Sequence, residues 1–190
     1  MFALINSKSS SSKYPAQKWI LWGIPVLCIV GCLIHYVYEW SGNLTLVGIF
    51  APTNESVWEH LKMTFWPMLI WWFVGYFILN KNNRISATQW FVACTSAILS
   101  CLMVILSFYY LYTGALGIES LILDIFTLFL GVAVGQDLAL HVYKYAKLTH
   151  YCLYIAFAIL ILLVFIFTLF TFAPPHIPLF RDALTGKYGI

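Results

Sequence analysis

The chain has 190 residues, of which 62% are apolar and only 9% are charged, and its formal net charge is +3. Soluble domains are typically about half apolar, so this composition excludes an ordinary soluble protein and indicates a membrane protein. The five cysteines all lie within apolar stretches, which argues against a disulfide framework, and no segment carries a nucleic-acid-binding signature.

Five long apolar stretches follow one another along the chain, at about residues 19–38, 60–79, 87–110, 119–139 and 151–172. Each is close to the length of about 20 residues that a helix needs to cross a bilayer. Helices are favoured because backbone groups in lipid must be satisfied within the segment. The sequence therefore predicts an all-α, polytopic membrane bundle of five transmembrane helices, forming one domain over residues 19–172.

The basic residues predict how this bundle is oriented. Seven of the ten Lys and Arg residues precede the first stretch or lie in the second–third and fourth–fifth connections: Lys8, Lys13, Lys18, Lys81, Arg84, Lys144 and Lys147. By the positive-inside rule these regions face the cytoplasm, with the N-terminus inside and the C-terminus outside. The Ser-rich, basic segment 1–18 is predicted to be a disordered cytoplasmic tail.

This orientation brings most of the acidic residues to the outer end of the bundle, together with three histidines. The acids are Glu39, Glu55, Glu59, Glu119, Asp124 and Asp182, and the histidines are His35, His60 and His176. Ionisable groups at membrane depth are costly and mark a functional site by default. Glu and His side chains suit zinc, manganese or iron. The candidate metal ligands are therefore His35, Glu39, Glu55, Glu59, His60 and His176.

The end of the first predicted helix carries a histidine and an acid on one face. His35 and Glu39 are four residues apart, and Gly31 lies on the same side, where it would let a neighbouring helix approach closely. This face is expected to point into the bundle. The pair could satisfy itself, or it could serve as a ligand or proton-relay pair.

The start of the second predicted helix holds the densest group of polar residues: Thr53, Asn54, Glu55, Ser56, Glu59, His60 and Lys62. Thr53 or Asn54 can cap a helix, and Ser56 with Glu59 fits a capping box. Capping alone does not require two acids together with His60 and Lys62. Further along, Pro67 frees the carbonyl of Met63 and is expected to kink the helix.

The fourth predicted helix places Asp124 on the same stripe as Gly131 and Gly135, whose spacing is typical of close helix packing. A central Asp costs roughly 2.5–3.5 kcal/mol on an insertion scale, so Asp124 is expected to face protein and to have a partner. The expected partners are His35, Lys62 or Arg181. For catalysis, Glu119 or Asp124 could act as a base, and Lys62 or Arg181 could bind an anionic group.

The C-terminal segment 173–190 is too apolar for a free tail. It contains Ile177, Phe180 and Tyr188 after prolines that end the fifth helix. It is predicted to fold back over the outer end as a lid, with His176 and Asp182 facing the polar cluster. The alternative is plain hydrophobic docking onto the rim of the bundle.

Two segments carry a resemblance, NESVWEHLK at 54–62 and PPHIPLFRD at 174–182. Together they resemble a family of small bacterial integral-membrane proteins with a domain of unknown function, over most of the chain beyond the Ser-rich start. The resemblance implies a multi-pass protein of the bacterial inner (plasma) membrane and no particular activity. Membrane hydrolases such as ceramidase-like enzymes are a looser analogy, and their His-x-x-x-His pattern is absent from this chain.

Three functions remain open from the sequence. The first is a membrane-embedded hydrolase assisted by a divalent metal, with a lipid or peptide-like substrate. The second is a transporter or binding protein for a cation or small solute, in which Asp137 and His141 would supply the inner end of a path. The third is a structural or partner-binding membrane subunit. The expected partners are membrane lipids and either a second copy or another membrane protein, but no nucleic acid.

Overall fold

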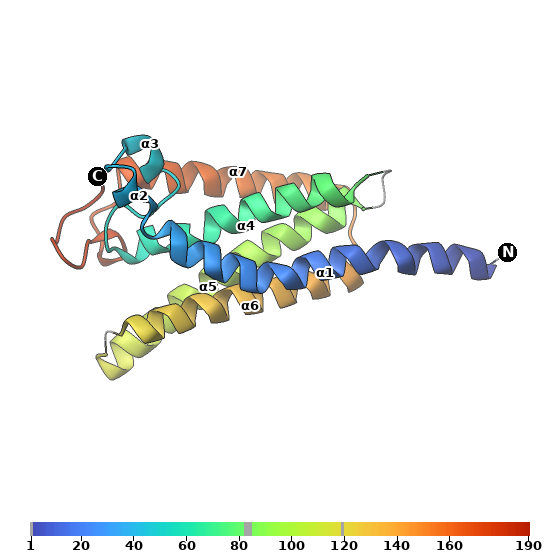
Figure 1. Cartoon of the computed structure of the whole chain (residues 1–190), viewed down its shortest axis with the longest axis horizontal. Coiled ribbons are helices and arrows are strands. Elements are labelled where there is room, and N and C mark those ends of the chain that lie inside the picture. The colour runs from blue at the N-terminus through green and yellow to red at the C-terminus, as the bar shows by residue number, and fades with distance from the viewer. Residues whose placement is uncertain (1, 82–84, 119) are drawn as a thin grey trace.

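The computed structural model describes residues 2–81, 85–118 and 120–190, with side chains described from residue 15 onward within these ranges. The described residues form an all-α structure (Figure 1). In chain order the helices are α1 (Phe2–Ile34), α2 (Val37–Trp40), α3 (Thr45–Gly48), α4 (Val57–Leu79), α5 (Ala87–Leu116), α6 (Leu121–Tyr145), α7 (Tyr151–Phe172) and the 3-10 helix η1 (Pro178–Phe180).

Within the described part of the chain, five helices are long and apolar enough to cross a membrane: Pro15–Ile34 of α1, and the whole of α4, α5, α6 and α7. This confirms the predicted fold class, an all-helical bundle of a multi-pass membrane protein. The most apolar span is α7, with a mean hydropathy of 3.0, and it is also the least buried, at 17% of its most apolar window. An apolar helix with so little protein around it is suited to contact with lipid chains.

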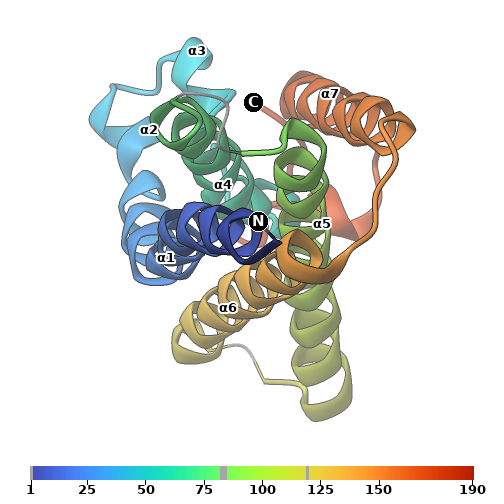
Figure 2. The ribbon, with the colours of Figure 1, turned by 90° about the vertical axis from the view of Figure 1, so that its right-hand side faces the viewer.

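The long helices pack as a bundle in which α5 contacts α4, α6 and α7, while α1 packs between α4 and α6 (Figures 1 and 2). Glycines allow the closest of these contacts. A Cβ atom added at Gly135 would lie 2.6 Å from the carbonyl oxygen of Ala97, and one at Gly131 would lie 3.1 Å from that of Cys101. The predicted stripe of small residues on α6 therefore faces α5, as expected of small residues spaced by four.

The ends of several helices differ from the predicted limits. Helix α1 begins at Phe2, within the segment predicted to be disordered, and ends at Ile34 rather than near residue 38. Helices α5 and α6 continue past the predicted limits, to Leu116 and Tyr145. Apolar periodicity marks the part of a helix within lipid, and it does not mark where the helix itself stops.

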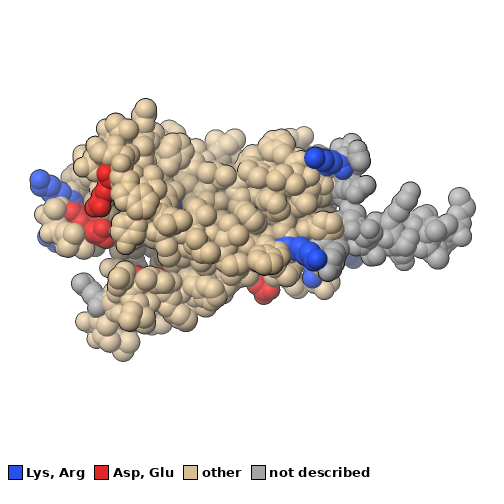
Figure 3. All heavy atoms as spheres, in the orientation of Figure 1, with Lys and Arg blue, Asp and Glu red and all other residues tan. Residues whose placement is uncertain are grey.

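Acidic and basic side chains are unevenly distributed between the two ends of the bundle. Figure 3 shows most of the visible Asp and Glu side chains at the end opposite to the one from which α1 projects, and Lys and Arg side chains at both ends. At this opposite end lie the short helices α2 and α3, the start of α4 and the C-terminal tail (Figure 1). Which end faces the cytoplasm remains a prediction of the positive-inside rule.

Candidate metal centre

Three of the predicted metal ligands come together at the acidic end of the bundle. His35 follows the end of α1, Glu55 lies in the loop before α4, and His60 lies in the first turns of α4. One ligand atom from each can be chosen so that all three lie within 4.8 Å of one another. The Nε2 atom of His60 is 3.2 Å from Glu55 Oε2, and that of His35 is 3.8 Å from Glu55 Oε1. We call these three residues the triad.

The hydrogen bonds of His60 determine which of its nitrogen atoms can bind a cation. Nδ1 of His60 lies 2.8 Å from the backbone carbonyl oxygen of Ser56, which can only accept a hydrogen bond. Nδ1 therefore carries the proton, and Nε2 of the neutral ring presents a lone pair to the Glu55 carboxylate. Two lone pairs at this distance repel each other, so the contact requires a positive charge, either a proton on Nε2 or a cation between the two groups.

The triad also brings two imidazole rings against one carboxylate. The rings of His35 and His60 are stacked with their centroids 5.3 Å apart. A proton on Nε2 of His60 would place one imidazolium against Glu55 and the stacked His35 ring. A divalent cation provides positive charge at one central point. It would also leave both rings neutral.

The donor set and its spacing suit a first-row divalent metal. Two histidines and one carboxylate are the ligands of several catalytic zinc sites, which keep a further position for water or substrate. Tetrahedral bonds of 2.0–2.2 Å place neighbouring donor atoms about 3.3–3.6 Å apart. The two histidine nitrogens lie 3.2 Å and 3.8 Å from the two oxygens of Glu55, and the three ligand atoms lie within 4.8 Å of one another. The Ser56 carbonyl bound to Nδ1 of His60 is the usual outer partner of a metal-binding histidine. Iron and manganese fit the same donors.

The contact between α1 and α4 places His35 within reach of the other two ligands. Pro67 of α4 leaves the carbonyl of Met63 without its helical hydrogen bond, as predicted. Gly31 of α1 packs there, because a Cβ atom at Gly31 would lie 3.0 Å from the Met63 oxygen. One turn later α1 ends, and the chain turns at His35 and Tyr36. The face of α1 that carries Gly31 thus points into the bundle, in agreement with the prediction.

Asp182 of the C-terminal tail holds the backbone of Glu55. Its carboxylate accepts hydrogen bonds from the N–H of Glu55 at 3.1 Å, from the N–H groups of Leu184 and Thr185 at 3.2 Å each, and from the Thr185 hydroxyl. Burial alone raises the pKa of Asp182, but these donors outweigh it and hold the pKa below its usual value. The tail therefore fixes the loop that presents the carboxylate of the triad.

The ionisation of Glu55 is governed by its histidine neighbours. When the rings are protonated, the hydrogen bond from His60 lowers the pKa of the Glu55 carboxyl, and the charges of His60 and His35 act in the same direction. Partial burial acts against them, but the pKa remains below its usual value. Glu55 is thus ionised at neutral pH, as a metal ligand must be.

The tail packs against the start of α4 through aromatic contacts as well. Phe180 is buried, and its ring lies 4.9 Å from that of Trp58 and 5.1 Å from that of Phe170. The side-chain amide of Asn54 donates a hydrogen bond to the carbonyl of Gly189 at 3.3 Å. These contacts fold segment 173–190 over the N-terminal end of α4. His176 of the tail is exposed, and its ring contacts Tyr188 rather than the triad.

Glu59 and Lys62 lie apart from the triad, in a buried ion pair. Lys62 Nζ is 2.6 Å from Glu59 Oε2, and it also donates to the Gly48 carbonyl at 2.8 Å. The same Glu59 oxygen accepts from the backbone N–H and the hydroxyl of Thr53, at 2.9 Å each. Ser56 caps α4 by accepting from the N–H of Glu59, as the capping box predicted, but the Glu59 carboxylate does not return to Ser56. The pair instead anchors the loop before α4.

The predicted pairing of His35 with Glu39 assumed a continuous helix and is wrong, because α1 ends at Ile34. The ion-pair partner of His35 among the described residues is Glu55. Glu39 is exposed and lines a cleft of about 240 Å³ that His35, Glu55 and Asp182 also border. An adjoining cleft of about 340 Å³ continues past Glu39 and Asp182 toward Lys187.

Two expected catalytic residues have other surroundings than predicted, and a third lies outside the described residues. Asp124 accepts a hydrogen bond from Tyr112 of α5, which was not among its expected partners, and its charge acts on His60. Arg181 is exposed and pairs through its backbone with Tyr188 of the tail. Glu119, the other candidate base, is outside the described residues.

Sequence reasoning missed three groups that complete this end of the molecule: the hydroxyl of Thr53, the carbonyl of Gly48 and the phenol of Tyr112. Thr53 was considered only as a cap. A backbone carbonyl carries no sequence signal, and Tyr112 is one of several tyrosines in its helix. A buried Lys and Glu nearby could have indicated that further partners were needed.

Comparison with known proteins gives a family and no activity. No curated protein and no solved structure matches the chain. A family model described as a family of unknown function, DUF6512, matches residues 8–190. This match includes all five membrane spans, the triad and the C-terminal tail. The chain therefore belongs to the DUF6512 family.

Proposed function

We propose that this protein is a metal-dependent membrane hydrolase whose divalent ion is held by His35, Glu55 and His60. The observation that carries the proposal is the arrangement of two imidazole nitrogens around one carboxylate, at separations of 3.2 Å and 3.8 Å. The proton on Nδ1 of His60 leaves the Nε2 lone pair directed at Glu55. A central cation would bind this lone pair and the Glu55 carboxylate together.

A bound divalent ion would lower the pKa of a coordinated water and polarise a carbonyl or phosphoryl oxygen. The chain supplies the other functions of such a site. Asp124, whose charge acts on His60, is the candidate base for a water proton. The tail, fixed by Asp182 and Phe180, forms one wall of the cleft that His35 and Glu55 border. Glu39 borders the cleft next to His35, where it can contact a polar group of the substrate.

The segregation of polar groups favours a hydrolase over a transporter. Both described clefts adjoin the acidic end, and the triad lies at this same end. Asp137 and His141, which a transport path would use at the other end, are exposed on α6. With Lys18, Lys81, Lys144 and Lys147 on the cytoplasmic side, the site would open to the outer face of the plasma membrane.

Metal content tests the proposal directly. We expect the protein, purified in detergent without chelators and loaded with zinc, to retain about one zinc ion per chain by elemental mass spectrometry. Glu55→Gln and His60→Gln should each lower the zinc affinity by at least about tenfold, because each removes a ligand. His176→Gln is the matched control, since His176 belongs to the same end of the molecule but contacts Tyr188. Equal zinc retention in Glu55→Gln and the wild type would refute the metal centre.

Hydrolysis is tested separately from metal binding. Incubation of the zinc-loaded protein with ester and amide lipids in vesicles should release a free acid, and a chelator should abolish this release. Asp124→Asn should lower the rate while zinc remains bound, because Asp124 is assigned to the water proton and not to the metal. If Asp124→Asn loses both zinc and activity in parallel, its assigned role is wrong.

A further inference from the structure

The face of α6 that packs against α1 is no longer covered by α1 at the acidic end of the bundle. Leu128 of α6 contacts Gly31 of α1, where an added Cβ atom would lie 3.5 Å from the leucine methyl group. Leu121 is seven residues before Leu128 and thus lies on nearly the same face of the helix. Because α1 ends at Ile34, three residues after Gly31, this face continues without it, and Leu121 is 74% exposed.

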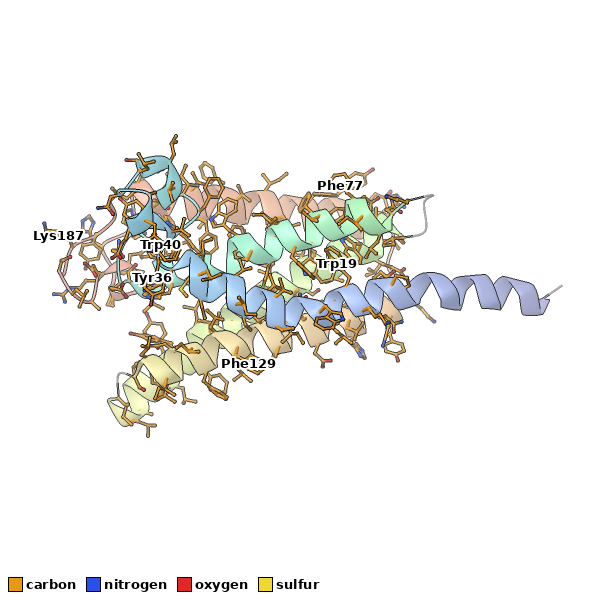
Figure 4. The ribbon with its side chains drawn as sticks, in the orientation of Figure 1. Trp19, Tyr36, Trp40, Phe77, Phe129 and Lys187 are labelled. Atoms are coloured by element: carbon orange, nitrogen blue, oxygen red, sulfur yellow. The ribbon has the colours of Figure 1, made fainter. Side chains whose placement is uncertain are left out.

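The tip of the α5–α6 pair stands apart from the rest of the acidic end. Figures 1 and 2 both show this tip on the opposite side of the bundle end from α2, α3 and the C-terminus. Figure 3 shows the surface hollowed between these two parts. Figure 4 shows Phe129 projecting from the side of α6 that faces away from α1, so the uncovered face is distinct from the outer one.

The uncovered face combines an apolar surface with a polar group near the triad. Leu121 and Ile125 are exposed apolar side chains on it. Asp124 lies between them in sequence, accepts a hydrogen bond from Tyr112, and is close enough for its charge to act on His60. A molecule that binds to this surface would need two parts. A hydrocarbon part would contact Leu121 and Ile125, and a polar part would point toward Asp124 and the triad.

We propose that this opening admits a membrane lipid sideways from the bilayer, with its headgroup directed toward His35, Glu55 and His60 and a hydrocarbon chain against Leu121 and Ile125. The inference rests on the proposed hydrolase function and names its substrate class as an amphiphilic lipid. A lipid fits because α1 and α6 are both spans apolar enough to border the bilayer, so lipid is the solvent at the mouth of the opening. The described clefts bordered by Glu39 and Asp182 have no lining residue from α6, so a hydrocarbon chain against Leu121 and Ile125 would enter by this lateral route.

Photochemical labelling tests the route without requiring turnover. The protein would be placed in phosphatidylcholine nanodiscs that contain a phosphatidylcholine with a diazirine in one acyl chain, and the labelled peptides would be identified by mass spectrometry. We expect strong labelling of segment 121–128. Leu121→Asn should reduce it by about tenfold, because it removes an apolar contact of the size of one leucine side chain. Ile122→Asn is the matched control, since Ile122 is 79% exposed but turned about 100° away, and labelling should stay within about twofold.

The controls separate this inference from the metal centre. A gel-filtration profile in detergent equal to that of the wild type shows that each asparagine variant is folded. In Glu55→Gln, which lacks a metal ligand, labelling of segment 121–128 should persist, so a failure of the metal proposal would not remove this readout. Equal labelling in Leu121→Asn and Ile122→Asn would overturn the lateral route. Weak labelling in the wild type, together with chemical cross-links between two copies at this segment, would identify a second chain as the occupant and would also overturn it.

Discussion

Lys62 and Glu59 lie three residues apart at the start of α4, and both side chains are buried, at 0% and 3% exposed. Spacing of this kind on an exposed helix would contribute only a few tenths of a kcal/mol. Here the two charges lie in a protein interior, where each requires the other. Thr53 and the Gly48 carbonyl complete the set of hydrogen-bonding partners. The pair therefore links the loop that contains α3 to the first turns of α4.

We expect Lys62→Met to destabilise the protein by about 3–5 kcal/mol, because it leaves the Glu59 carboxylate buried without its counter-charge. The double variant Glu59→Gln/Lys62→Met should recover most of this loss, since no uncompensated charge remains. Unfolding of the detergent-solubilised protein, followed by tryptophan fluorescence, measures both. A double variant as unstable as Lys62→Met would show that packing around the lysine stem, rather than charge, dominates.

Residue type alone identified the members of the triad as candidates but could not select them. His35, Glu55 and His60 were among six predicted ligands, because Glu and His at the end of a membrane span are rare. Selecting three of the six depends on where α1 ends, and no proline or glycine marks the turn at His35. Tertiary contacts made by residues far along the chain, such as Asp182, decide the backbone position of Glu55.

At the scale of elements, the contact between α5 and α6 depends on the absence of two side chains. A Cβ atom at Gly135 would meet the Ala97 carbonyl at 2.6 Å, and one at Gly131 would meet the Ile105 side chain at 2.7 Å. A side chain can move away from such a contact, but a helix carbonyl cannot move without displacing its helix. Gly135 is therefore the more sensitive of the two positions.

Gly135→Ala should destabilise the α5–α6 pair by about 1–3 kcal/mol through overpacking. Gly114→Ala provides the matched control, because Gly114 lies within α5 and a Cβ atom there would meet nothing within 4 Å. That substitution should stabilise α5 by up to about 1 kcal/mol, from helix propensity alone. SDS titration of the protein in mixed micelles measures both changes in the free energy of unfolding. Opposite signs are expected, and destabilisation by both alanines would contradict the assigned packing.

The existence of the five long helices could be predicted from hydropathy, since each must supply enough apolar length to cross the bilayer. Their ends were less predictable. The last turns of α5 and the first helical residues of α1 lie beyond the apolar stretches, at Leu116 and Phe2. The short helices α2 and α3 could not be predicted from hydropathy, because each has only four residues. They lie in the connection between α1 and α4, and the Gly48 carbonyl of α3 accepts a hydrogen bond from Lys62.

For the whole molecule, the separation of charge between the two ends has a direct consequence for orientation. The basic connections and the acidic site lie at opposite ends of one bundle (Figure 3). The potential and the insertion machinery of a membrane both favour retaining Lys and Arg on the cytoplasmic side. The orientation of the chain in the membrane therefore determines the side on which the triad opens.

We expect the C-terminal tail to face away from the cytoplasm. In a variant with all five native cysteines replaced, Thr185→Cys should react with a membrane-impermeant maleimide added to intact cells, because Thr185 is exposed. A cysteine at Lys147, in the α6–α7 connection, should react only after the membrane is opened. The readout is a gel shift of the labelled protein. Reaction of the Lys147 position alone in intact cells would reverse the orientation and place the triad on the cytoplasmic side.

The packing of the tail on α4 also governs when the site can be completed during synthesis. Asp182 and Phe180 follow all five spans in the chain, so they are synthesised after every span. Until they emerge, the N–H of Glu55 and the ring of Trp58 lack their final contacts. A nascent chain thus contains both histidines of the triad early, but the carboxylate between them is fixed only after the segment beyond α7 has been synthesised.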